Sequence, residues 1–222
     1  MSGQSLPTVL LTGFDPFGGE SINPSWLAVE RLHGELIAGH RIVGVQLPTS
    51  FARAPRILRA AIRKHAPALV LCLGQAGGRA QISLERIAIN IDDARIADND
   101  GAQPVDTPIA RNGPTACFTT LPIKSMLVAL QAANIPIEVS QTAGTFVCNH
   151  VFYALMRTLA ARPAHSRPRG GFVHIPYLPD QVKDRSDTPG LALDTVVDAL
   201  RIMIETALIT REDRPIAAGA TH

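Results

Sequence analysis

A cysteine stands at the point in the sequence where a helix is expected to begin. In the segment SQTAGTFVCNHVFYALM (residues 140–156), Val151 and Leu155 follow Cys148 at helical spacing, which places the helix start near residues 146–148. A thiol at a helix N-terminus meets the positive end of the helix dipole and free backbone N–H groups, so its pKa is expected to fall. The same N–H groups are able to hold an oxyanion. Cys148 is therefore a candidate nucleophile, although a buried structural cysteine is the commoner interpretation of such a segment.

A cysteine nucleophile needs a base, which is most often a histidine. Of the seven histidines, His174 is the best placed, because it ends the apolar segment GFVHIPY (residues 171–177), which is typical of a strand. A hydrogen-bonded core histidine is the alternative interpretation of this residue. His150 follows Cys148 by two residues and points to a different side of the helix, so it is set aside.

The base in turn needs a group that orients it. Glu85 is the candidate, because it stands in an otherwise apolar and alternating stretch, ISLERIAIN (residues 82–90). An ion pair with the neighbouring Arg86 is an equally good interpretation of this segment. A polar stretch with further acids follows and is interpreted as a solvated loop; these acids are Asp92, Asp93, Asp98 and Asp100. They lack the spacing of a calcium-binding loop, so no metal is expected.

Two glycine-rich segments, GFDPFGG (residues 13–19) and GQAGG (residues 74–78), follow predicted strands. Neither segment matches the dinucleotide-binding fingerprint or the P-loop. Phe14 and Phe17 lie three residues apart in the first segment, and they fit either a core plug or an apolar wall for a small flat ligand. A small pocket with aromatic walls and a few backbone donors and acceptors would suit a compact amide ring.

Short apolar runs alternate along the chain with segments of helical periodicity. Strands are expected at residues 9–12, 41–47, 68–73, within 82–92, at 135–139 and at 171–175. Helices are expected after residue 23 and at 50–64, 125–133, 147–161 and 191–208. This order predicts one α/β domain over residues 1–222, with a mainly parallel sheet and a frayed tail after about residue 210. If the sheet is parallel throughout, the candidate residues that follow its strands converge on its carboxyl edge.

Composition limits the classes of function. With 222 residues, 46% of them hydrophobic, the chain is long enough for one substantial core. The net charge is only +2 and the arginines are scattered, so no nucleic-acid partner is expected. Three cysteines without paired spacing argue against a disulfide framework and for a reducing cytoplasm, with Cys72 and Cys117 taken as structural. The first apolar run is too short for a signal peptide or a membrane span, so a soluble cytoplasmic protein is expected.

The sequence resembles a known family, the pyroglutamyl peptidase I (pyrrolidone-carboxylate peptidase) family of cysteine peptidases. Residues 74–90 (GQAGGRAQISLERIAIN) are similar to the glutamate signature of that family, and residues 140–149 (SQTAGTFVCN) to its cysteine signature. The segments TGFDPFGG, NPSW, INIDDARIADNDG and GFVHIPYLP also look like the family. The similar segments span the chain from residue 9 to roughly the last helix.

The resemblance implies a role for each candidate residue. It implies a catalytic triad of Cys148, His174 and Glu85, a pyroglutamyl ring walled by Phe14, Phe17 and Phe146, lactam recognition by Asn23 and Gln75, and Arg95 near the oxyanion. It further implies a three-layer α/β/α fold, peptides with an N-terminal pyroglutamate as substrates, no metal or cofactor, and a homotetramer.

Two other functions fit the same residues less well. A nucleoside-phosphorylase-like enzyme on a similar α/β fold would need a phosphate site of basic residues, which the glycine-rich segments do not offer. A non-catalytic small-molecule binding protein would keep the pocket but would have no use for the nucleophile.

Overall fold

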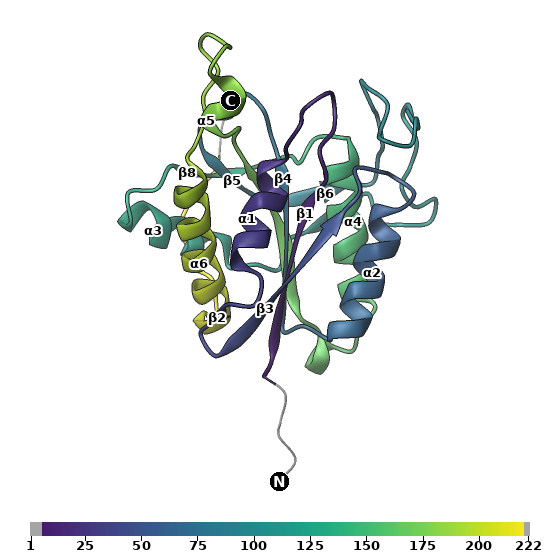
Figure 1. Cartoon of the computed structure of the whole chain (residues 1–222). Helices are drawn as coiled ribbons and strands as arrows, with labels where there is room; N and C mark the ends of the chain where they lie inside the picture. The colour runs from purple at the N-terminus through teal and green to yellow at the C-terminus, as the bar shows by residue number, and fades with distance from the viewer. Residues whose placement is uncertain (1–5, 220–222) are drawn as a thin grey trace.

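A seven-stranded sheet lies at the centre of the computed structural model, which describes residues 6–219. In spatial order its strands are β2 (Leu36–Ile37), β3 (His40–Leu47), β1 (Thr8–Phe14), β4 (Leu69–Gln75), β9 (Arg169–Ile175), β5 (Ile82–Glu85) and β8 (Ile137–Ser140). Helices cover both faces of this sheet (Figure 1), so the expected three-layer α/β/α architecture is confirmed.

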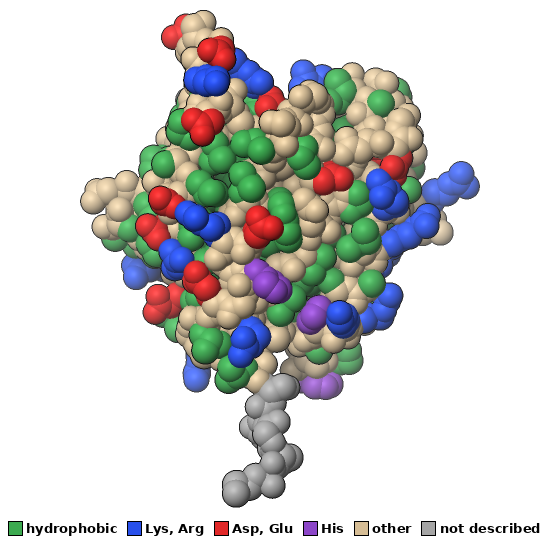
Figure 2. All heavy atoms as spheres, viewed as in Figure 1, with side chains coloured by type: hydrophobic (Ala, Val, Ile, Leu, Met, Phe, Trp, Pro, Cys, Tyr) green, Lys and Arg blue, Asp and Glu red, His purple; other side chains and the backbone are tan. Residues whose placement is uncertain are grey.

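One face of the sheet carries α1 (Pro24–Leu32), α3 (Ile123–Ala132) and α6 (Leu193–Ile209), and the other carries α2 (Ala54–His65) and α4 (Val147–Ala160). A two-stranded ribbon of β6 (Ile87–Ile89) and β7 (Ala116–Phe118) packs beside α4. The short helices η1 (Ala164–Ser166) and α5 (Pro179–Val182) flank β9. Within residues 6–219, no helix has the length and apolar character needed to cross a membrane. On the face shown in Figure 2, basic and acidic side chains are interspersed.

The alternation of side chains along two strands decides which residues face the layer of α2 and α4. Successive side chains of a strand point to opposite faces. In β5, Ile82 and Leu84 belong to the core under α1, α3 and α6, so Glu85 points to the opposite face. In β9, Val173 belongs to the same core, so His174 shares the face of Glu85. The polar positions of two apolar strands therefore meet on one side of the sheet.

The sheet is mainly parallel, as expected, but three of its seven strands, β2, β5 and β8, run opposite to the other four. β1, β3, β4 and β9 are parallel, but β5 pairs antiparallel with β9 and parallel with β8. Only residues 76–81 join β4 to β5, whereas a parallel crossover needs about a dozen residues or more. The chain therefore turns back into β5, and Glu85 reaches His174 sideways across an antiparallel pair instead of from a neighbouring carboxyl end.

The tail after Thr210, expected to be frayed, is held in place up to residue 219. The carboxylate of Asp213 accepts hydrogen bonds from the backbone N–H groups of Lys124 (3.0 Å) and Ser125 (2.8 Å), at the start of α3. Pro122, the residue before this helix, offers no capping side chain. Free N–H groups at a helix start need acceptors, and the tail supplies one. Residues 220–222 lie outside the described part of the chain.

The acid-rich stretch after β6 is not the solvated loop that was expected. Asp92 and Asp98 are buried. One carboxylate oxygen of Asp98 accepts a hydrogen bond from the backbone N–H of Phe51 at 2.9 Å. Asp100 forms a two-pronged ion pair with Arg53, with both contacts at 2.7 Å. These acids therefore tie the loop to the start of α2.

Candidate active site

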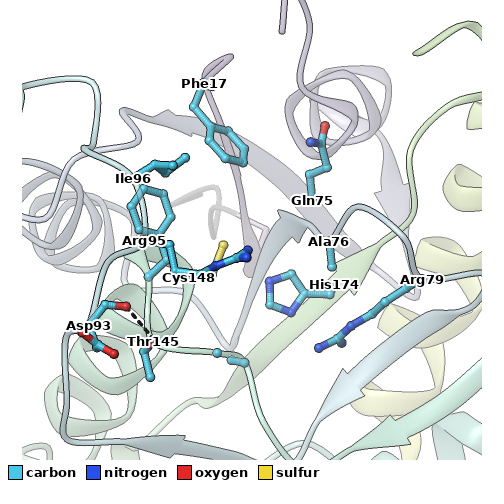
Figure 3. A pocket seen from close by; sticks show the side chains of 13 residues that line it. Phe17, Gln75, Ala76, Arg79, Asp93, Arg95, Ile96, Thr145, Cys148 and His174 are labelled. Atoms are coloured by element: carbon cyan, nitrogen blue, oxygen red, sulfur yellow. Dashed lines mark hydrogen bonds between the residues drawn. The ribbon is translucent and has the colours of Figure 1, made fainter. Parts of the chain in front are cut away.

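A cavity of about 420 Å³ opens at the face shared by Glu85 and His174. Among the predicted site residues, its lining includes Cys148, His174, Arg95, Phe17, Phe146 and Gln75 (Figure 3). Arg79, Asp93 and Ile96 also line it, and the sequence interpretation had not named Arg79 or Ile96. Segments far apart in the chain thus supply one site.

His174 is held by a carboxylate. Its Nδ1 lies 2.7 Å from Oε1 of Glu85, and both side chains are nearly inaccessible to solvent, at 5% and 0%. An ionised carboxylate only accepts hydrogen bonds, so Nδ1 carries the proton and Nε2 is left as the basic nitrogen of the neutral ring. The ring lies beside the sulfur of Cys148 in Figure 3. The pair is therefore built to present a base to the thiol.

The charge of Glu85 is maintained by its neighbours. Nη1 of Arg79 donates to the same Oε1 at 2.7 Å, and its Nη2 donates to the carbonyl of Thr142 at 3.2 Å. Burial by itself raises the pKa of Glu85, but the hydrogen bond and charge of His174, together with the charge of Arg79, outweigh it and hold the pKa below its ordinary value. Glu85 is thus a carboxylate at neutral pH.

The alternative ion pair between Glu85 and Arg86 does not form. Arg86 donates instead to the carbonyl of Ala218 at 2.5 Å, on the tail. Arg86 directly follows the last residue of β5, and its guanidinium is bound to the tail, away from the carboxylate. The ion-pair partner of Glu85 is Arg79, in the turn before β5, and not Arg86.

Cys148 occupies the second residue of α4, as the sequence predicted. Phe146 has an extended backbone and is followed directly by the helix. In the first turn the N–H of Cys148 has no partner within the helix, which leaves it available as an oxyanion donor. The side chain is half-buried and lines the cavity.

The expected fall in the pKa of Cys148 is not found. Burial raises the pKa of its thiol to about 12, and the negative charge of Glu85 acts in the same direction. The positive charge of Arg79 lowers the pKa but does not outweigh them. The helix N-terminus is a local influence, whereas the loss of solvation and the carboxylate come from the assembled fold. The resting site therefore holds a neutral thiol.

Space for the sulfur depends on a glycine in β4. A Cβ atom added to Gly74 would lie 2.8 Å from Sγ of Cys148 and 2.9 Å from Cζ of Phe172. Such contacts force one of the groups to move. The lack of a side chain at Gly74 thus leaves the space that Sγ of Cys148 needs.

We expect Gly74→Ala to reduce kcat/KM of the reaction at the sulfur of Cys148 by about a hundredfold, because displacing a reacting atom by about 1 Å has an effect of that order. Overpacking should also cost about 1–3 kcal/mol of stability. Steady-state kinetics and thermal unfolding measure both effects. Cys72→Ala, on the same face of β4, is the control and should keep its activity. A fully active Gly74→Ala enzyme would show that the sulfur does not need this space.

Arg95 lines the cavity from a loop that is tied to the start of α4. Oγ1 of Thr145 donates to the carbonyl of Asp93 at 2.7 Å, and the N–H of Asp93 donates to the carbonyl of Thr145 at 2.9 Å. The guanidinium of Arg95 makes no hydrogen bond to the rest of residues 6–219, and in Figure 3 it extends toward the sulfur of Cys148. A cationic donor is therefore free beside the candidate nucleophile.

Aromatic side chains form an apolar wall. The rings of Phe17 and Phe146 lie 6.0 Å apart, and Phe51 packs edge-on against Phe146 at 5.3 Å. The sequence interpretation did not include Phe51, which supports the wall from the core. Phe14 does not belong to the wall: it is 2% exposed and packs on Phe172 at 6.4 Å, outside the lining of the cavity. Of the two interpretations of Phe14, the core plug is correct.

Asn23 also lies outside the cavity lining and has a different task from the expected lactam recognition. Its Oδ1 accepts hydrogen bonds from the N–H (3.1 Å) and the hydroxyl (2.8 Å) of Ser25, and its Nδ2 donates to the carbonyl of Asp15 at 2.9 Å. The side chain caps the start of α1, where asparagine before proline is favourable. Its polar groups are engaged in this cap.

His150 was set aside as a base, and it does lie outside the cavity lining. Its Nδ1 is 2.8 Å from Oδ2 of Asp92, and its ring packs edge-on against Phe51 at 5.7 Å. Within residues 6–219, no group of three His, Cys, Asp or Glu side chains is arranged to hold a metal ion.

The fold and the site together define a cysteine hydrolase with an α/β/α architecture: a thiol at a helix start, a histidine–carboxylate pair and a free guanidinium share one cavity. The sequence profile of the pyroglutamyl peptidase family matches residues 7–210. The chain belongs to the pyroglutamyl peptidase family.

Full-length relatives agree with this assignment. The chain is 55% identical over 217 residues to pyrrolidone-carboxylate peptidase 1 of Ralstonia nicotianae, covering 98% of this chain and 100% of that protein. Its fold is similar to that of pyroglutamyl peptidase I from Bacillus amyloliquefaciens, with a TM-score of 0.91, 49% identity and coverage of 96% and 100%. The pyrrolidone carboxyl peptidase of Thermococcus litoralis superposes with a TM-score of 0.92 at 34% identity, again covering 96% and 100%.

The resemblance noted in the sequence is thereby confirmed, and the protein is a hydrolase of the cysteine-peptidase type. The phosphorylase-like and binding-protein alternatives are set aside with it.

Proposed function

We propose that this protein hydrolyses the amide bond after an N-terminal pyroglutamyl residue, with Cys148 as nucleophile, His174 as base and acid, and Glu85 as the group that orients the imidazole. The observation that carries this assignment is the 2.7 Å contact between Nδ1 of His174 and Glu85, beside a cavity that His174 shares with Cys148. It matches the roles of nucleophile, base and orienting acid in other catalytic triads.

In the first step, Nε2 of His174 takes the thiol proton while the sulfur attacks the carbonyl carbon of the pyroglutamyl residue. The raised pKa of Cys148 makes this proton transfer part of the attack, because a neutral thiol is a poor nucleophile. Glu85 stabilises the imidazolium that results. The oxyanion accepts hydrogen bonds from the N–H of Cys148 and from Arg95.

In the second step, the imidazolium of His174 gives its proton to the leaving amine, the C–N bond breaks, and a thioester on Cys148 remains. A water molecule then attacks the thioester while His174 takes one of its protons. The C–S bond breaks, the thiolate regains its proton from His174, and pyroglutamate leaves.

Arg79 is a positioning residue in this scheme. It contacts the carboxylate of Glu85 at 2.7 Å. Within the described residues it makes no hydrogen bond to Cys148 or His174. Its charge helps to keep Glu85 ionised, and it opposes the rise in the pKa of Cys148. The triad is thus electrically balanced by a fourth side chain.

The pocket selects the lactam ring by shape and by hydrogen bonding. Phe17 and Phe146 offer an apolar wall, and Gln75 offers an amide at the end of β4. A site built to hydrogen-bond a buried group rejects analogues that lack it, because its own polar groups would stay unpaired. Phe14 and Asn23 take no part in this pocket.

The assay that tests the function compares fluorogenic aminocoumarin amides of pyroglutamate, proline and glutamate. We expect a kcat/KM for the pyroglutamyl amide about 10⁴-fold above those of the other two, since proline lacks the ring carbonyl and glutamate carries charges in place of the lactam. Failure to cleave the pyroglutamyl amide, or equal cleavage of the prolyl amide, would exclude the proposed function.

Other expectations from the sequence stay predictions. They are a single domain, a homotetrameric assembly, a cytoplasmic location, and the lack of a nucleic-acid partner, a metal or a cofactor.

A further inference from the structure

We propose that Gln181 sets the hydrogen-bonding polarity of the pocket: it holds the side-chain amide of Gln75 so that the NH₂ group, and not the carbonyl oxygen, faces the substrate. The NH₂ group then donates to the lactam carbonyl. This inference rests on the proposed function and assigns a positioning and specificity-determining role to a residue outside the cavity lining.

The polarity is fixed by a backbone group. The N–H of Leu178 donates to the side chain of Gln181 at 3.0 Å. A backbone N–H can only donate, so the atom of Gln181 that it meets is the carbonyl oxygen Oε1. The NH₂ group of Gln181 must therefore point the other way, toward Gln75 and Glu20.

A carboxylate on that other side confirms this orientation. Nε2 of Gln181 lies 3.3 Å from Oε2 of Glu20, and an ionised carboxylate can only accept. Glu20 is itself held by Arg185, whose Nη2 is 2.5 Å from Oε1 of Glu20. The amide of Gln181 is thus fixed at both ends, by a group that only donates and by one that only accepts.

The orientation passes on to Gln75. Nε2 of Gln181 is 3.1 Å from the side chain of Gln75. Since Gln181 is the donor in this contact, the atom of Gln75 that it meets is the oxygen Oε1. The NH₂ group of Gln75 makes no hydrogen bond to any other group of residues 6–219, and the side chain lines the cavity. In Figure 3 this nitrogen lies on the side of Phe17, and the oxygen lies away from it.

The two segments that carry these glutamines pack closely against each other. Gly77, two residues after Gln75, lies so close to the ring of Tyr177 that an added Cβ would overlap it. The guanidinium of Arg185 covers the same ring, 5.1 Å from its centroid. The loop after β4 therefore packs directly on the segment that leads into α5, which places the two glutamines side by side.

The consequence for substrate choice follows from the donor. A buried NH₂ group that has no acceptor is unfavourable, by about 1–3 kcal/mol. The lactam carbonyl of pyroglutamate supplies an acceptor, whereas an N-terminal proline has no ring oxygen. Gln181 thus contributes to the preference for a lactam without touching it.

Two changes separate the polarity of the pocket from the mere presence of Gln75. In Gln181→Met the amide of Gln75 is free to turn over. In the exchange variant Glu20→Gln/Gln181→Glu the net charge is kept, but the residue facing Gln75 becomes an acceptor, so Gln75 must donate to it and turn its oxygen to the cavity. Glu20→Gln alone is the matched control, because Leu178 still fixes Gln181. Asp180→Asn, exposed on the same short helix, is a second control.

The readouts are the inhibition constant of 2-pyrrolidone, which is the bare lactam ring, and kcat/KM for the pyroglutamyl amide. We expect 2-pyrrolidone to bind about tenfold more weakly to Gln181→Met and about a hundredfold more weakly to the exchange variant. Both controls should stay within about threefold of the parent enzyme, because in each of them the N–H of Leu178 still fixes Gln181 and Gln181 still donates to Gln75. Thermal unfolding and the rate of alkylation of Cys148 show whether each variant keeps its fold and its site.

An exchange variant that binds 2-pyrrolidone as well as Glu20→Gln does, or no more weakly than Gln181→Met does, overturns the inference. In that outcome the parent enzyme would still cleave the pyroglutamyl amide, so the proposed function would stand. A parent enzyme that does not cleave that amide would instead refute the function, whatever the variants bind.

Discussion

Replacing Cys148 with serine is expected to lower kcat/KM for the pyroglutamyl amide by about 10⁴-fold or more, the range found when the nucleophile of a triad is removed. The reason is specific to this site. His174 and Glu85 are arranged to remove a proton from sulfur, and a serine hydroxyl is shorter and far less acidic than the thiol. Cys117→Ser, in β7 and outside the cavity lining, is the control and should keep its activity.

The pKa of Cys148 gives the same experiment a second readout. Because the thiol has a pKa of about 12, iodoacetamide should alkylate it slowly at neutral pH. The rate should then rise about tenfold per pH unit through pH 7–10, since only the thiolate reacts. Loss of activity should follow the labelling of Cys148 in a one-to-one ratio. A rate that is already fast and flat across this range would show a preformed thiolate and would contradict the neutral resting thiol.

The residues of the triad could be found in the sequence because each breaks a local pattern. Glu85 and His174 are polar positions in apolar strands, and Cys148 begins a helix with clear periodicity. In a strand, such a residue must lie on a defined face, and the structure brings both strand residues to the same face. Local pattern was enough to make these residues candidates, but the family resemblance was needed to prefer catalysis over their structural interpretations.

What the sequence could not provide depends on long-range geometry. The ion pair of Glu85 with Arg79 exists because the chain turns back between β4 and β5, and no periodicity signals the direction of the new strand. The raised pKa of Cys148 likewise depends on burial and on a carboxylate from another strand. Short elements such as β2, β7 and α5 are too brief to show any periodicity.

Residues with two good local interpretations were decided by packing. Phe14 ends β1 and is absorbed by the core, whereas Phe17 lies three residues later in the loop and reaches the cavity. The resemblance assigned Asn23 to lactam recognition, but Ser25 and Asp15 use its polar atoms in the cap of α1. The tail shows no periodicity, yet Asp213 binds it to the start of α3 as a helix cap. A cap needs one side chain and no apolar face, so periodicity does not reveal it.

The second large effect is expected at Glu85, where two substitutions separate charge from orientation. Only Oε1 of Glu85 is used: it accepts from Nδ1 of His174 and from Nη1 of Arg79, while Oε2 has no hydrogen-bond partner within the described residues. A glutamine can keep its carbonyl oxygen in the place of Oε1. Glu85→Gln therefore retains the tautomer and orientation of His174 and loses the negative charge, whereas Glu85→Ala loses all of them.

We expect kcat to fall by about 10²-fold in Glu85→Gln and by about 10⁴-fold in Glu85→Ala, the larger loss being that of a base in the wrong tautomer. Glu138→Gln, on the neighbouring strand β8 and hydrogen-bonded to Ser83, is the matched control for exchanging a carboxylate. If Glu85→Gln is as inactive as Glu85→Ala, its NH₂ group must face His174, and an oxygen in the place of Oε1 is not sufficient to orient the ring.

The pH dependence of stability tests the same charge without substrate. Because the pKa of Glu85 is held below its ordinary value, about 4.3 for a free glutamate, its ionised form stabilises the fold at all pH values above that value. The stabilisation is lost as the pH falls through the lower pKa of the folded protein, since the unfolded chain takes up the proton first. The free energies of unfolding in urea of the parent and of Glu85→Gln should therefore differ most clearly above about pH 5. Below that the parent should lose its advantage, and a difference that does not shrink on acidification would mean that Glu85 is not the ionised partner of His174 and Arg79.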